Sequence, residues 1–160
     1  MNGRAVAREV AMRARTWAAV GLALVAVTWA GLGYLSTKPT DFHTYRVAAV
    51  GAAQSAYGGL ATAQITSRAL ADGKVTGPYA TSVLGDAREA LAGAVKRLAA
   101  ETPPDPATTA MRDELGPLLL DTDRALSMME EATTAADQRA AADGATATAE
   151  ALHRFIGDHT

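Results

Sequence analysis

Apolar and polar residues divide the chain into one long apolar run followed by several amphipathic stretches. Residues 16–37 contain no charged side chain, and Arg15 and Lys38 close the run at its two ends. At about 1.5 Å per residue, the 19 residues from Trp17 to Leu35 form a helix about 28 Å long, close to the hydrocarbon thickness of a bilayer. The run therefore predicts a single transmembrane helix, and the rest of the chain is organised around it.

The charges beside the apolar run indicate its orientation. Four basic residues precede it against one acidic residue: Arg4, Arg8, Arg13 and Arg15 against Glu9. Because basic loops stay on the cytoplasmic side, residues 1–15 are expected in the cytoplasm and the C-terminal part outside. The predicted localisation is the cell membrane, as a single-pass signal-anchored protein in contact with the lipid bilayer.

Aromatic and small residues within the run bear on its anchoring and packing. Trp17 and Tyr34 lie near the two ends, where amphipathic rings anchor a helix at the water–lipid interfaces, and Trp29 is a third aromatic residue, less well placed. One face carries small residues at spacings of four and three, a pattern that favours close packing against a second helix: Ala19, Ala23, Ala26, Ala30 and Gly33. Alanine is common throughout the chain, so such a stripe also arises by chance.

A cleaved secretory signal is the alternative interpretation of this segment. Its basic start and the small residues Thr28 and Ala30 fit a signal peptidase site. The apolar run, however, is longer than the roughly 7–15 residues of a typical signal, which favours an uncleaved anchor. The alternative predicts a secreted helical protein. The chain has no cysteine, which excludes a lipoprotein and any disulfide.

The residues after the span predict an all-α fold, because they are rich in helix-forming residues and show no sustained period-two alternation. Start and stop residues mark the helix ends: Asp41, Gly73, Gly77-Pro78, Pro103-Pro104, Asp105-Pro106 and a capping-box pattern at Thr134-x-x-Asp137. The expected helices cover residues 41–72, 78–101, 106–133 and 137–157. Short connections make an antiparallel, extracytoplasmic four-helix bundle the expected architecture.

Apolar residues at helical spacing predict the core face of each helix. The expected core positions are Tyr45, Ala49, Ala52, Ala56, Leu60, Ala63 and Leu70; Leu84, Ala87, Leu91, Ala94 and Leu98; Met111, Leu115, Leu118, Thr122, Ala125, Met129 and Ala132; and Ala141, Ala145, Thr148, Leu152 and Phe155. The last two stripes are out of phase by about two residues, which places a break between Thr133 and Asp137. Without that break, residues 105–142 would form one helix. Pro117, inside the third helix, predicts a kink.

Charge and motifs limit the function classes. Residues 41–160 carry ten basic and 16 acidic side chains, which argues against nucleic acid as a partner. No nucleophile elbow, phosphate-binding loop, dinucleotide fingerprint or zinc-ligand pair occurs in the sequence. We therefore expect neither an enzyme nor a bound cofactor.

Two groups of side chains resemble metal ligands without completing a site. Glu150-x-x-His153 has the spacing of di-iron bundle ligands, but a second such pair is missing, so a helical surface is the favoured interpretation. Four carboxylates lie along the third helix: Asp121, Asp123, Glu130 and Glu131. Because calcium loops need an irregular backbone, these carboxylates predict a solvated helix face.

Leu118-Leu119-Leu120 suggests a contact surface, since three consecutive leucines cannot share one narrow stripe. Leu118 fits the core stripe, whereas Leu120 points about 160° away and either covers the kink at Pro117 or meets a partner. The expected function is a non-catalytic protein-binding or scaffold module, with another membrane protein or a second copy as partner. The alternative is a small-molecule-sensing ectodomain that signals through a partner membrane protein. The architecture is similar to bacterial sensory ectodomains, although no motif is shared.

Overall fold

Five helices make up residues 41–160, the part of the chain that the computed structural model describes. They are α2 (Phe42–Ala71), α3 (Gly77–Ala99), α4 (Pro106–Glu131), α5 (Ala135–Gly144) and α6 (Thr146–His159). The all-α fold is therefore confirmed for these residues, and none of them is in a strand.

The membrane-related predictions all fall outside the described residues. They concern the cytoplasmic tail, the span at 16–37, the anchoring residues Trp17, Trp29 and Tyr34, and the small-residue stripe from Ala19 to Gly33. Among residues 41–160, no helix is both long enough and apolar enough to cross a bilayer.

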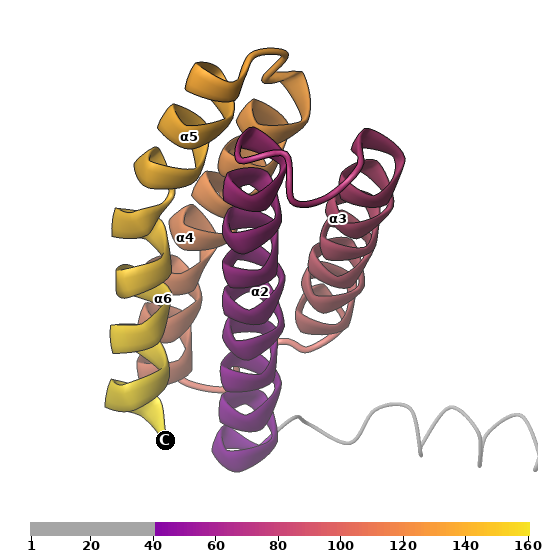
Figure 1. The fold of residues 1–160 in the computed structure, drawn as a ribbon. Helices are drawn as coiled ribbons and strands as arrows, with labels where there is room; N and C mark the ends of the chain where they lie inside the picture. The colour runs from indigo at the N-terminus through magenta and orange to yellow at the C-terminus, as the bar shows by residue number, and fades with distance from the viewer. Residues whose placement is uncertain (1–40) are drawn as a thin grey trace, which may run out of the picture. The chain divides into compact units, whose positions relative to one another are not determined.

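α2 is the central helix of the bundle (Figure 1). α3 packs along one side of it, α5 and α6 follow its other side, and α4 contacts all four of the other helices. Within residues 41–160, α3 contacts neither α5 nor α6. α2, α3 and α4 run antiparallel in succession, and α5 and α6 together take the place of a fourth antiparallel helix. The bundle therefore has the expected four-helix arrangement.

Small residues bring α2 and α3 close together. A Cβ atom at Gly59 would lie 3.4 Å from the carbonyl oxygen of Ala87, which shows how closely the two helices approach. The core of this interface consists largely of alanine: Ala52, Ala56 and Ala63 on α2, and Ala80, Ala87 and Ala94 on α3. α3 consequently contacts α2 far more extensively than it contacts α4.

The helix ends form where the capping residues predict. The side chains of Asp41, Asp105 and Thr134 each accept a hydrogen bond from a backbone N–H in the first turn of α2, α4 and α5. α2 ends in a Schellman motif: the N–H of Lys74 donates to the Ala69 carbonyl at 2.8 Å, and Gly73 has a φ of 68°. Each cap satisfies a backbone group that the helix end would otherwise leave unpaired.

The helix expected over residues 137–157 is present as two consecutive helices, because α5 ends and α6 begins on either side of Ala145. The Gln64 side chain on α2 explains the interruption. It is buried, and its Nε2 donates to the Ala142 carbonyl at 2.7 Å. Arg68, one turn further along α2, pairs with Asp143 at 2.9 Å. A tertiary donor therefore takes a carbonyl that a continuous helix would pair internally.

The assignment of Leu118 to the core stripe is wrong. Leu119 is buried in the core cluster, whereas Leu118 is only half-buried and packs against its edge. The buried positions of α4 run 111, 115, 119 and 122, which is as regular a helical spacing as the expected 111, 115, 118 and 122. Leu70, Ala132 and Thr148, also expected in the core, are half-buried.

Candidate functional site

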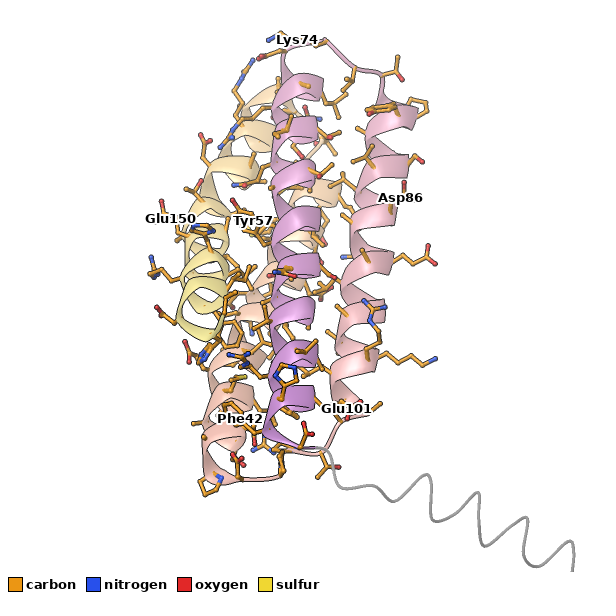
Figure 2. The ribbon with its side chains drawn as sticks, turned by 90° about the horizontal axis from the view of Figure 1, so that it is seen from below. Phe42, Tyr57, Lys74, Asp86, Glu101 and Glu150 are labelled. Carbon is orange, nitrogen blue, oxygen red and sulfur yellow. The ribbon has the colours of Figure 1, made fainter. Side chains whose placement is uncertain are left out.

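A groove with a volume of about 900 Å³ lies between α3 and α4. Its walls are mainly apolar, with Leu91, Val95, Leu98, Pro103, Pro117, Leu119 and Leu120 as the larger apolar side chains. Glu101 also lines it and lies at the end of the bundle where Phe42 begins α2, opposite Lys74 (Figure 2). The groove therefore lies in the half of the bundle that contains the start of α2.

The groove exists because α3 is held against α2 and because several of the residues that line the groove are small. Ala92 and Ala99 of α3 and Gly116 of α4 face the groove. A Cβ atom built at Gly116 would meet nothing within 4 Å. The short side chains leave unfilled volume between two helices whose backbones are fixed by their packing on α2.

Pro117 leaves one backbone carbonyl of α4 without its usual helical hydrogen bond beside the groove. It lies inside α4 without ending the helix, and both Pro117 and Asp113 line the groove. Because proline has no N–H, the Asp113 carbonyl lacks the helical donor that residue 117 would normally supply. The kink expected at Pro117 stays a prediction, but the residue itself belongs to the groove.

Tyr45 supplies the most unusual group in the groove. The residue is only 1% exposed and belongs to the core, yet it lines the groove from α2. Among the residues that the structure describes, none forms a hydrogen bond with its hydroxyl. Burial raises the pKa of this hydroxyl, an effect that nearby Arg112 opposes and Asp113 reinforces. The hydroxyl is therefore protonated at neutral pH and is free to donate.

The charged groups around the groove are largely engaged with one another. Arg112 donates to one oxygen of Asp113 from Nε at 2.9 Å and from Nη2 at 2.7 Å. At Asp123, the carboxylate is 3.8 Å from Nε of Arg88, whose Nη1 also pairs with Glu130 at 2.6 Å. Arg88 thus connects α3 to α4 beside the groove, and within residues 41–160 its Nε is the one fully buried side-chain polar atom without a hydrogen-bond partner.

Leu120, the residue expected at a partner face, is 61% exposed and lines the groove. Leu120 and Pro117, which came from different sequence arguments, are thus brought to one site by α4. The role of Leu120 as a partner contact stays a prediction.

Apart from Asp123, the side chains that resemble metal ligands in the sequence do not line the groove. Glu150 and His153 are exposed on α6, with Glu150 on the far side of the bundle from Asp86 (Figure 2), and the His153 ring lies 5.6 Å from that of Tyr57. No group of three His, Asp or Glu side chains in residues 41–160 is arranged to hold a metal. On α4, Asp121 pairs with Arg124 at 2.6 Å.

Sequence reasoning treated Tyr45 as a core residue and did not identify the groove. One signal was available: Tyr45 is the only tyrosine in a stripe otherwise made of Ala and Leu, and a buried tyrosine hydroxyl normally requires a partner. The groove itself depends on the separation of α3 from α4, which has no local pattern in the sequence.

No protein-family model, curated protein or solved structure matches the chain. The functional interpretation therefore rests on the groove and on the predicted span.

Proposed function

We propose that this protein is a single-pass membrane protein whose helical bundle binds a small, largely apolar molecule in the groove between α3 and α4. One observation carries the proposal: the groove is about 900 Å³ in volume, and its lining is apolar except for a few polar groups. Small-molecule sites typically have volumes of roughly 300–1,000 Å³ and this kind of lining. The groove is thus suited to an organic ligand of moderate size.

Binding without chemical conversion fits the side chains present. No serine or histidine is among the described residues that line the groove, and its arginine is paired with a carboxylate. The hydroxyl groups of Tyr45 and Thr102 therefore have no imidazole beside them in this lining that could activate either one as a nucleophile. The proposed role is that of a receptor or carrier domain.

The predicted span gives the groove a position in the proposed topology. The span ends at Thr37, and Tyr45 follows within the first turn of α2. In this topology the groove belongs to an extracytoplasmic bundle. A bound molecule would be detected there by a partner membrane protein or would be passed on from there.

A groove-filling substitution tests the proposal. Gly116→Phe places a large ring where the structure has open space, and Gly85→Phe, on the exposed side of α3, is the matched control. We would measure melting of the full chain in detergent micelles by circular dichroism, with and without 2-ethylnaphthalene. Micelles take up the same share of this probe in every sample, so differences between variants reflect the protein.

The probe is expected to raise the Tm of the wild type and of Gly85→Phe, because a ligand that binds only the folded state stabilises it. Gly116→Phe should fold with the same helicity and show no rise. An equal rise in Gly116→Phe, or no rise in the wild type, would show that the groove is not a small-molecule site.

A protein partner is a second candidate function, favoured by the outer face of α4. Leu120 and Met128 lie two turns apart on this face and are 61% and 58% exposed. If this face binds a second copy of the chain, sedimentation equilibrium of the full chain will show a dimer that Met128→Glu dissociates without loss of helicity. A monomer in both proteins would exclude self-association through this face.

A further inference from the structure

The Tyr45 hydroxyl makes no hydrogen bond to any other described residue. Its neighbours in the α2 core stripe are Ala49 and Ala52, so a phenylalanine at position 45 would fill the same space without a polar atom. Among residues 41–160 only Arg88 Nε is fully buried without a partner, so the Tyr45 hydroxyl is in contact with solvent at the groove surface. A molecule bound in the groove would displace that water, and the hydroxyl would then be buried and unpaired, at a cost in free energy, unless the molecule offers an acceptor.

The charges of the lining limit the chemistry of that molecule. Three carboxylates, Glu101, Asp113 and Asp123, line the groove against one guanidinium, Arg112. An anionic group beside Tyr45 would lie close to these carboxylates, while the nearby guanidinium is already bound to Asp113 at 2.7 Å.

A cationic group is disfavoured for a different reason. Asp113 is engaged by Arg112, and Asp123 lies 3.8 Å from Arg88, so neither carboxylate lacks a counter-ion. The protonated Tyr45 hydroxyl donates a hydrogen bond more readily than it accepts one from an ammonium group.

We infer that the groove binds a neutral, largely apolar molecule with one hydrogen-bond acceptor, a carbonyl or hydroxyl oxygen, which the Tyr45 hydroxyl recognises. The inference rests on the proposed function, because it specifies the occupant of the same groove. It makes Tyr45 the specificity-determining residue and the apolar walls the main source of affinity.

Matched probes separate recognition of the acceptor from binding of the apolar body. 2-Acetylnaphthalene and 2-ethylnaphthalene have nearly the same shape and differ by one carbonyl oxygen, and 2-naphthoate carries a charge in its place. Each would be titrated against the full chain in micelles, with Tm as the readout. The proteins compared are the wild type, Tyr45→Phe and Tyr57→Phe, the last changing a tyrosine of the same helix that lies outside the groove.

The wild type and Tyr57→Phe should bind the ketone about 3- to 10-fold more tightly than the ethyl compound, the ratio expected for one net hydrogen bond. Tyr45→Phe should bind the two equally, because only the ketone loses an interaction. Without a probe, the Tm of Tyr45→Phe should equal or exceed that of the wild type, since no native hydrogen bond is removed.

The other outcomes are distinguishable. If both neutral probes bind but the wild type does not prefer the ketone, the inference about Tyr45 is wrong while the proposed function stands. Tightest binding of 2-naphthoate would contradict the neutral head group. A marked fall in Tm for unliganded Tyr45→Phe would show that the hydroxyl is structural. If no probe binds, the proposed function itself fails and a protein occupant becomes the better explanation.

Discussion

The three consecutive leucines of α4 have three different environments, although their side chains are chemically identical. Leu119 is buried, Leu118 is half-buried, and Leu120 is 61% exposed at the groove. Successive helical residues differ by about 100° in direction, so a core face of limited width can include only part of such a run. Their relative burial is therefore a sensitive measure of the rotation of α4 in the bundle.

We predict that Leu119→Glu unfolds the bundle while Leu120→Glu leaves it folded. A carboxylate in the core without a partner is expensive to bury, whereas exposed substitutions usually change the unfolding free energy by no more than about 0.5 kcal/mol. Helicity and Tm of both variants, measured by circular dichroism, check this. If the two variants unfold to the same extent, the rotation assigned to α4 is incorrect.

The sequence could not choose between Leu118 and Leu119. A stripe through either leucine has helical spacing, and the two positions hold the same residue. The choice depends on which side of α4 faces α2 and α6, and this is set by all the helices together. Leu120, by contrast, was predictable as the outlier because it lies outside either stripe.

Among the structural elements, the helix ends agree best with the sequence, because capping depends on local chemistry. Asp105 forms a full capping box with Thr108, and Gly73 takes the left-handed conformation that terminates α2. The interruption at Ala145 was missed for the opposite reason. It depends on Gln64, which is 78 residues away from Ala142 in the sequence.

Two glycines, Gly58 within α2 and Gly73 just after its end, should respond to alanine in opposite directions. Gly73→Ala forces a Cβ atom into a backbone with a φ of 68°, which costs about 1 kcal/mol. Gly58→Ala, at an exposed mid-helix position with open space around it, should stabilise the fold by about 0.5–1 kcal/mol. Urea denaturation of both variants measures the difference, and a destabilising Gly58→Ala would indicate that this face of α2 packs against something.

The junction of α2 with α5 should depend on pH. Hydrogen bonds from Arg139 at 2.9 Å and from Lys74 at 3.0 Å hold the pKa of Asp72 below its ordinary value of 3.8. Because the pKa is lowered in the folded state, this stabilisation is fully present above pH 3.8 and is lost as the pH falls through the lowered pKa.

Asp72→Asn is therefore expected to lower the Tm slightly at neutral pH, since exposed ion pairs contribute little. The difference from the wild type should shrink as the pH falls below 3.8. Melting curves over a pH series check this, with Asp86→Asn on α3 as a control without an ion pair among residues 41–160. A difference that persists unchanged in acid would mean that the carboxylate charge is not responsible.

For the whole molecule, the groove results from an uneven distribution of packing. Alanine and glycine bring α3 against α2, and no comparable seam joins α3 to α4. Sequence patterns predict which face of each helix is buried, but they do not predict the distance between two helices that both pack on a third. The fold class was therefore predictable, whereas the site was predictable only through its separate members, Pro117 and Leu120.

The final prediction concerns the segment before the bundle. The apolar run from Trp17 to Leu35 has 19 residues, longer than the roughly 7–15 of a cleaved signal and long enough to cross a bilayer. Protein extracted from membranes should accordingly retain the span, and its intact mass should correspond to the full chain. Protease added outside the cells should digest the bundle, because the arginine-rich flank predicts that residues 41–160 lie on the outer side. A soluble chain beginning near Gly31 would show instead that the segment is a cleaved signal, and the groove would then belong to a secreted carrier.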